Sequence, residues 1–233
     1  FSVLYFNEMR YDINNPSWED RDRLILSIGH TAPVLYASLA EAGFFPKDEC
    51  MTLRKIGSRL QGHPSKDSEL PGVETSAGSL GQGLGIAIGM ALSAKMDEKN
   101  YRTYCVMGDG ELQEGSVWEA AMAASNYRLD NLCAIIDRNR LQIDGSTENV
   151  MALEPLDEKW TSFGWNVVEI DGHDHNDIVD AFDVARATKG QPTLILANTI
   201  MGKGVKSIEN DNKWHGKVPT KEQLIDFLNE LEK

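Results

Sequence analysis

Two side chains of this 233-residue chain could hold a metal ion. One is the carboxylate of Asp109, which lies between two glycines in Gly108-Asp109-Gly110, and the other is the amide of Asn139. Each follows an apolar stretch, residues 103–107 and 132–136, that is typical of a buried strand. Loops beyond the carboxyl ends of adjacent parallel strands meet at one sheet edge, so Asp109 and Asn139 are predicted to converge. With a backbone carbonyl two residues after Asn139, they would supply half of an octahedral oxygen shell. Mg²⁺ completes such a shell with water and phosphate oxygens.

Two other interpretations compete with a metal site. Taken alone, Asp109 could cap a turn and Asn139 could support another. The spacing of 28 residues between Gly110 and Asn139 favours the interpretation in which Asp109 and Asn139 bind one metal ion. The glycine patterns Gly108-x-Gly110-x-x-x-x-Gly115 and Gly83-x-Gly85-x-x-x-Gly89 both depart from G-x-G-x-x-G, which disfavours a nicotinamide-nucleotide site.

The composition limits the class of ligand and the compartment. The chain carries 23 Lys and Arg against 36 Asp and Glu, a formal charge of −13, which argues against binding to nucleic acid or to an anionic membrane. A phosphate-bearing ligand would therefore need a metal ion or backbone N–H groups. The three cysteines share no metal-ligand spacing, and no run of 18 apolar residues or signal peptide is present. We expect a cytoplasmic protein whose natural N-terminus precedes Phe1.

The order of the predicted elements indicates the fold class. Strands are predicted over 103–107, 132–136, 166–170 and 193–198, and helices over 31–42, 116–127, 176–188 and 221–231. A small-residue helix follows the glycine-rich residues 78–83, and an amphipathic helix is expected at the N-terminus. Apolar strands that alternate with helices predict an α/β fold, a doubly wound, mainly parallel sheet with helices on both faces. We expect residues 1–233 to form one domain.

Longer stretches of the sequence resemble the transketolase family, and Gly108-Asp-Gly110 followed by Asn139 resembles the thiamine-diphosphate signature. Seven blocks carry the resemblance, from about Asn15 to Gly216: Leu26-Ser-Ile-Gly-His30, Gly62-His63-Pro64, Pro71-Gly-Val-Glu-Thr75, Gly78-Ser-Leu-Gly-Gln-Gly83, Gly108-Asp-Gly-Glu-Leu-Gln-Glu-Gly-Ser-Val-Trp-Glu-Ala-Ala-Met122, Asp171-Gly-His-Asp174 and Trp214-His-Gly216.

The resemblance implies the cofactor thiamine diphosphate, held with Mg²⁺ or with Ca²⁺ or Mn²⁺ in its place. The metal ligands would be Asp109, Asn139 and the Leu141 carbonyl. Other cofactor contacts would come from positions around both glycine loops and the loop after Asn139: Gly78, Leu80, Gly108, Gly110 through its N–H, and Ile143.

The resemblance also implies roles for three histidines and one acid. His30, His63 and His215 would line the substrate channel, with His30 and His215 also near the cofactor, where near-neutral imidazoles suit proton transfer and oxyanion stabilisation. Glu114 would have a catalytic role as an acid at a subunit interface, linked to the activating glutamate of the partner chain. For His173 a turn-capping role is favoured, and His175 is also a weaker candidate.

The remaining domains of the family have no counterpart in this sequence. The pyrimidine-binding domain, with the glutamate that activates the cofactor, and the C-terminal domain would come from a partner chain. The resemblance therefore implies the N-terminal subunit of a split transketolase, a heterotetramer that transfers a two-carbon ketol unit from a ketose phosphate to an aldose phosphate. Alternatives are a specialised enzyme for sulfosugars or branched sugars, a non-catalytic cofactor-binding partner, or a piece of a longer transketolase.

Overall fold

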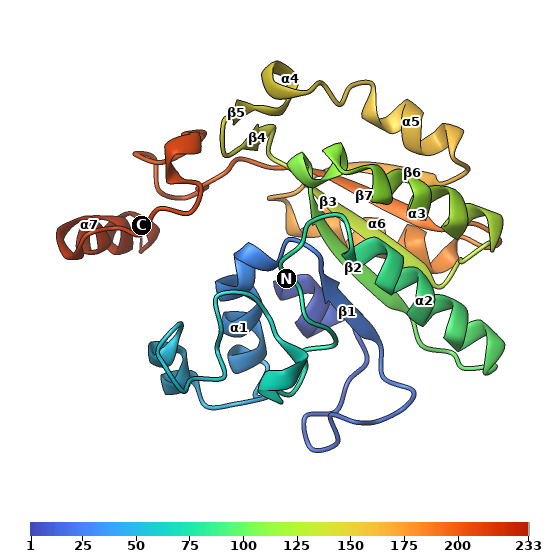
Figure 1. Ribbon diagram of the computed structural model, residues 1–233, viewed down its shortest axis with the longest axis horizontal. Coiled ribbons are helices and arrows are strands. Elements are labelled where there is room, and N and C mark those ends of the chain that lie inside the picture. Colours follow the sequence, from blue (N-terminus) through green and yellow to red (C-terminus); the bar gives the residue numbers. More distant parts are fainter. Residues whose placement is uncertain (233) are drawn as a thin grey trace.

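A sheet of five parallel strands forms the centre of the molecule (Figure 1). The computed structural model describes residues 1–232. The strands lie in the order β1-β2-β3-β7-β6. Their bounds are β1 Arg23–Leu26, β2 Thr103–Gly108, β3 Leu132–Arg138, β6 Asn166–Asp171 and β7 Thr193–Asn198. A separate antiparallel hairpin joins β4, Leu141–Gln142, to β5, Gly145–Ser146.

The strands are apolar on both faces because helices cover both. Within β2, Tyr104 and Val106 belong to one core cluster, whereas Cys105 and Met107 belong to the other. Successive side chains of a strand point to opposite faces, so a strand buried on both sides has no polar alternation. This arrangement confirms the predicted doubly wound α/β fold.

The helices divide between the two faces of the sheet. Helices α2, α3 and α5 pack on one face, and α1, α6 and the N-terminal helical turn Leu4–Glu8 pack on the other. Their bounds are α1 Ala32–Glu41, α2 Gly83–Met96, α3 Gly115–Asn126, α4 Thr147–Val150, α5 Leu156–Ser162, α6 His175–Ala187 and α7 Lys221–Leu231. Within residues 1–232, none of these helices has the length and apolar character needed to cross a membrane.

Most predicted elements agree with the structure to within two residues. The bounds predicted for β7 and α7 match, and the amphipathic N-terminal helix is present as a short turn. Strand β3 runs further than predicted, because Asp137 and Arg138 still pair with Ala197 and Asn198 of β7. Asn139 is therefore the first residue beyond the strand.

The carboxyl ends of the parallel strands carry the loops that matter for chemistry. The glycine-rich loop before α2, the turn after β2 and the β4–β5 hairpin all lie at this edge (Figure 1). Residues 199–232, here called the C-terminal arm, leave the end of β7 and lead to α7, which stands apart from the sheet. A capping box between Thr220 and Gln223 begins α7.

Candidate functional site

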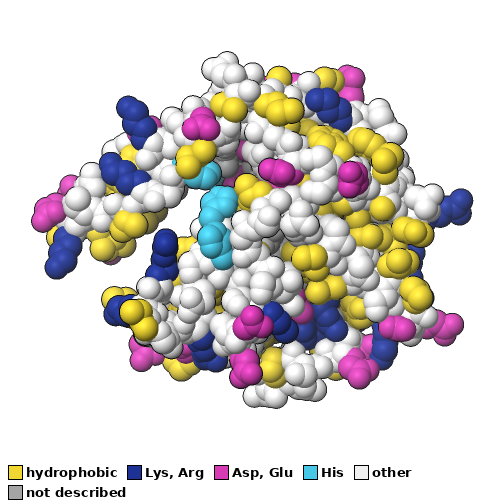
Figure 2. Space-filling model, viewed as in Figure 1, with side chains coloured by type: hydrophobic (Ala, Val, Ile, Leu, Met, Phe, Trp, Pro, Cys, Tyr) yellow, Lys and Arg dark blue, Asp and Glu magenta, His cyan; other side chains and the backbone are white. Residues whose placement is uncertain are grey.

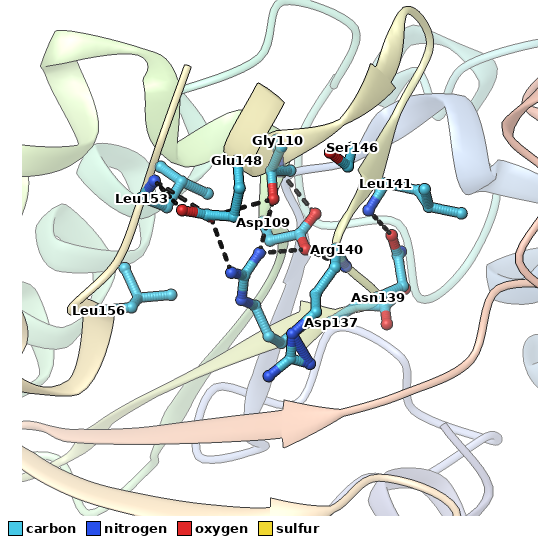
Figure 3. Close-up of polar contacts among 12 residues, drawn as sticks. Asp109, Gly110, Asp137, Asn139, Arg140, Leu141, Ser146, Glu148, Leu153 and Leu156 are labelled. Carbon is cyan, nitrogen blue, oxygen red and sulfur yellow. Dashed lines mark hydrogen bonds and ion pairs between the residues drawn. The ribbon is translucent and has the colours of Figure 1, made fainter. Parts of the chain in front are cut away.

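Asp109 lies at the centre of this edge, directly after β2. Its side chain is 1% exposed. Oδ1 accepts a hydrogen bond from the Gly110 N–H at 2.7 Å, and Oδ2 accepts one from the Arg140 N–H at 2.6 Å (Figure 3). Oδ2 also accepts from Arg138 Nη1 at 2.9 Å. The carboxylate therefore joins the turn after β2 to the turn after β3.

Asn139 is oriented by groups on both sides of its amide. Its Nδ2 donates to Asp137 Oδ2 at 3.3 Å, and Asp137 in turn accepts a hydrogen bond from the Thr199 hydroxyl. Its Oδ1 accepts from the Leu141 N–H at 2.9 Å. Because Asp109 binds the N–H of the residue next to Asn139, the structure brings Asp109, Asn139 and Leu141 into one small region, as the sequence predicted.

The donor chemistry of this region fits a divalent cation with oxygen ligands. It offers one carboxylate, one amide oxygen and a main-chain carbonyl, which are hard ligands for Mg²⁺. No group of three or more His, Cys, Asp and Glu that could hold a metal ion occurs in residues 1–232. An ion held here would thus have one carboxylate ligand and would need phosphate oxygens or water to complete its shell.

The glycines beside Asp109 keep the backbone close to its neighbours. A Cβ on Gly110 would lie 3.0 Å from the Gln142 Cβ, and one on Gly108 would lie 3.0 Å from Ile28 Cγ2. The Gly110 N–H, which the resemblance assigns to the diphosphate, donates to Asp109 in this structure. Burial raises the pKa of the Asp109 carboxyl, although the Arg138 guanidinium and the surrounding N–H groups act in the opposite direction.

Two of the predicted histidines meet although they come from distant parts of the chain. His30 lies in the turn Gly29–Thr31 after β1, and His215 lies in the C-terminal arm. Their ring centroids are 5.1 Å apart. Figure 2 shows histidine side chains gathered along the hollow between the body of the molecule and this arm.

The environment of His30 favours its neutral form. Partial desolvation of the ring lowers the pKa of His30 below its ordinary value of 6.5, and the neighbouring His215 and His63 lower it further. A neutral imidazole at pH 7 can both accept and donate a hydrogen bond.

His63 and the glycine-rich loop complete this side of the edge. The His63 Cγ lies 3.6 Å from the position that a Cβ on Gly78 would take. A Cβ on Gly29 would lie 2.9 Å from backbone atoms of Ala77 and Gly78, so glycine is required there for the loop to cross the end of β1. Leu80 follows in the same loop and is half-buried.

Other predicted residues are more peripheral. Ile143 is 65% exposed at the tip of the β4–β5 hairpin, and its carbonyl accepts a hydrogen bond from Asn212 Nδ2 at 3.1 Å. Glu114 is exposed at the start of α3. The ring Nε2 of His173 accepts from the Ile200 N–H at 2.8 Å, which is a structural contact. His175 lies within 3.3 Å of the Ser2 hydroxyl, away from the cluster.

Two buried charged residues at this edge were not predicted from the sequence. Glu111 accepts hydrogen bonds from Ser27 and from the N–H groups of Gly81 and Gly108. Arg138 forms ion pairs with Asp109, Glu148 and Glu154. The available signal was position alone: Arg138 directly precedes the predicted ligand Asn139, and Glu111 follows the predicted ligand Asp109 by two residues.

Comparison with known proteins agrees with this geometry. The family described as "Transketolase, thiamine diphosphate binding domain" matches residues 1–230. One of the subunits of the apulose-4-phosphate transketolase of Phocaeicola vulgatus is 47% identical over 230 residues, which are 99% of this chain and 81% of that protein. The 6-deoxy-6-sulfo-D-fructose transketolase subunit SqwG of a Clostridium species is 45% identical over 232 residues, 100% of this chain and 84% of that protein.

A solved structure extends the similarity to the fold. The transketolase from Leishmania mexicana superposes with a TM-score of 0.93 at 34% identity, covering 100% of this chain and 36% of that one. The parallel sheet with these loops at its carboxyl edge is an α/β domain of the thiamine-diphosphate-binding class. The chain belongs to the transketolase family, in which it corresponds to the thiamine-diphosphate-binding domain.

Proposed function

We propose that this chain is the thiamine-diphosphate-binding subunit of a split transketolase. Together with a partner subunit it would transfer a two-carbon ketol unit from a ketose phosphate to an aldose phosphate. The observation that carries the proposal is the meeting of Asp109, Asn139 and Leu141 at the sheet edge that also holds His30 and His215. The names of two relatives, both of them transketolase subunits, support the split organisation.

The metal and the cofactor would bind at the ends of β2 and β3. Asp109, Asn139 and the Leu141 carbonyl would hold Mg²⁺, for which Ca²⁺ or Mn²⁺ could substitute. When bound, thiamine diphosphate supplies the nucleophilic carbon and the electron sink that ketol transfer needs. The contacts of this chain with it would come from the glycine loops and the hairpin, namely Gly78, Leu80, Gly108, Gly110 and Ile143.

The histidines would handle protons on the substrate side. His30 is held neutral at pH 7, so it can accept a proton from a substrate hydroxyl, while the adjacent His215 can orient it or share the proton. His63, against Gly78, would donate to a developing oxyanion. Glu114 at the exposed start of α3 would face the partner subunit.

The partner subunit would supply what this domain does not. We propose that it carries the pyrimidine-binding domain and the activating glutamate, and that two copies of each chain form a heterotetramer.

Three free cysteines, two of them buried, agree with a reducing compartment, and we propose the cytoplasm. Acidic composition makes nucleic acid and anionic membranes poor partners.

A specialised sugar substrate is the second candidate. The names of two relatives refer to apulose 4-phosphate and to 6-deoxy-6-sulfo-D-fructose, rather than to an ordinary ketose phosphate. A transketolase that acts on a branched sugar or a sulfosugar would use the same metal site and the same histidines in this chain. Such an enzyme would differ from an ordinary transketolase in the groups that bind the phosphate or sulfonate of the sugar.

The proposal is tested by purifying the tagged chain from its own cells with Mg²⁺ and thiamine diphosphate present. The purified material is then assayed for ketol transfer from fructose 6-phosphate, apulose 4-phosphate and 6-deoxy-6-sulfo-D-fructose to an aldose phosphate. We expect a second chain in equal amount and transfer from one of these donors, which also identifies the sugar class. A stable complex without transfer from any ketose would contradict the enzymatic function.

A further inference from the structure

Arg138 is a fully buried cation at the end of β3, with side-chain exposure of 1%. Its Nη1 donates to Asp109 Oδ2 and to the Thr147 hydroxyl, both at 2.9 Å. Its Nη2 donates to Glu148 at 3.0 Å and to Glu154 at 2.7 Å. One guanidinium therefore connects the predicted metal ligand to the segment that follows the β4–β5 hairpin.

We propose that Arg138 is a positioning residue for the metal site. It fixes the Asp109 carboxylate in a single orientation and attaches residues 147–156 to that carboxylate. The inference rests on the proposed function, because it concerns the ion that Asp109 would hold.

The hydrogen bonds of Asp109 determine which oxygen is left for a metal. Oδ2 accepts from both Arg138 Nη1 and the Arg140 N–H, which uses its two lone pairs. Oδ1 accepts only from the Gly110 N–H and keeps one lone pair. Arg138 thus makes Asp109 a monodentate ligand through Oδ1. Without Arg138 the carboxylate could rotate and offer either oxygen.

The two glutamates balance the charge of Arg138. A guanidinium beside a metal ligand would by itself repel a divalent cation. Glu148 and Glu154 are 36% and 47% exposed, so their charges can be solvated while they share the buried guanidinium with Asp109. The pKa of each glutamate is lowered, with the Arg138 guanidinium among the causes. The group of one cation and three carboxylates keeps a net negative charge at the place where a cation would bind.

The same glutamates organise the segment that follows the hairpin. Glu148 accepts a hydrogen bond from the Leu153 N–H at 3.2 Å (Figure 3) and another from the Glu154 N–H at 3.4 Å. Glu154 accepts from the Leu156 N–H at 2.9 Å. This segment continues directly from the hairpin that carries Ile143. Arg138 therefore connects the predicted metal ligand Asp109 to the part of the proposed cofactor site that the hairpin forms.

The test compares Arg138→Met and Arg138→Lys in the complex with the partner subunit. Mn²⁺ binding is followed by electron paramagnetic resonance, and hydrogen exchange is followed at residues 147–156. We expect Arg138→Met to weaken Mn²⁺ affinity roughly 10- to 100-fold, as for other groups that orient metal ligands, and to accelerate exchange in the segment. Arg138→Lys restores part of the affinity, because it retains a cation beside Asp109. The matched control is Arg59→Met, which removes a half-buried ion pair with Glu49 away from the site.

The outcomes separate this inference from the proposed function. Wild-type affinity for Mn²⁺ in a folded Arg138→Met protein would overturn the positioning role. Absence of Mn²⁺ and thiamine diphosphate binding by the wild-type complex would instead contradict the proposed function. If Arg138→Met fails to fold, the double variant Glu148→Gln, Glu154→Gln leaves Arg138 with Asp109 as its one charged partner. We then expect accelerated exchange at 147–156 with several-fold weaker Mn²⁺ binding, and unchanged values for both would overturn the inference.

Discussion

The buried carboxylate of Glu111 accepts a hydrogen bond from the Gly81 N–H at 2.8 Å and so joins the turn after β2 to the loop before α2. The same side chain accepts from the Ser27 hydroxyl at the end of β1 and from the Gly108 N–H at 3.3 Å. Ser27 in turn accepts from the Gly83 N–H at 3.1 Å. One acidic side chain therefore holds together three loops at the carboxyl edge of the sheet.

Replacing Glu111 with alanine should destabilise the domain. The substitution leaves the buried N–H of Gly81 and the Ser27 hydroxyl without their acceptor, which costs on the order of 3 kcal/mol in the free energy of unfolding. Glu111→Gln should cost less, because its amide oxygen can still accept. Chemical denaturation measures both, with the exposed Glu119→Ala as control. Equal stability of Glu111→Ala and wild type would show that these hydrogen bonds contribute nothing to the free energy of unfolding.

His30 should titrate below the ordinary histidine pKa of 6.5. NMR titration of the ring protons measures this pKa directly. His215→Ala should raise the pKa of His30 toward the ordinary value, because it removes a neighbouring ring that lowers this pKa and opens the His30 ring to water. His175→Ala, on α6, should leave it unchanged. A His30 pKa above 6.5 in the wild-type protein would contradict the described environment.

The lowered pKa of His30 also has a consequence for stability. In the unfolded chain His30 binds a proton near pH 6.5, whereas the folded state resists protonation until a lower pH. The unfolded state therefore holds more protons in this interval, and the free energy of unfolding decreases as the pH falls below about 6.5. The His30→Ala variant should lose this part of the pH dependence, as measured by thermal unfolding across that interval.

Substitution of either His30 or His63 should affect turnover more than cofactor binding. We expect His30→Ala and His63→Ala, in the complex with the partner, to lower kcat roughly 100-fold, the lower part of the range for general acid–base groups. The dissociation constant of thiamine diphosphate should change by only a few-fold. Steady-state assays and calorimetry give the two quantities. Normal turnover in both variants would make these histidines structural.

The sequence predicted the fold and the meeting of Asp109 with Asn139 for a simple physical reason. Apolar strands separated by helices form a parallel sheet, and parallel topology brings the loops after neighbouring strands together. The helix over 221–231 was predictable because Thr220 and Gln223 form a local capping box.

The burial of Glu111 and Arg138 beside the candidate site was not predictable in the same way. Glu111 and Arg138 are charged, and charged residues near turns are usually solvated. Their burial depends on groups from separate segments, such as Gly81 for Glu111 and Glu154 for Arg138. Likewise, the contact of His30 with His215 depends on how the C-terminal arm folds back, which no local pattern specifies.

The role of Asp109 in holding the metal and the cofactor is tested most directly by calorimetric titration of thiamine diphosphate into the complex with its partner, with and without Mg²⁺. Wild type is compared with Asp109→Ala, with the isosteric Asp109→Asn, and with Asp144→Ala as an exposed control in the hairpin. We expect Mg²⁺-dependent binding in wild type and Asp144→Ala, and a loss of affinity on the order of 100-fold or more in both Asp109 variants while the fold is retained. Binding of wild-type affinity in folded Asp109→Ala, or binding that does not depend on Mg²⁺, would contradict the assignment of this edge as the cofactor site.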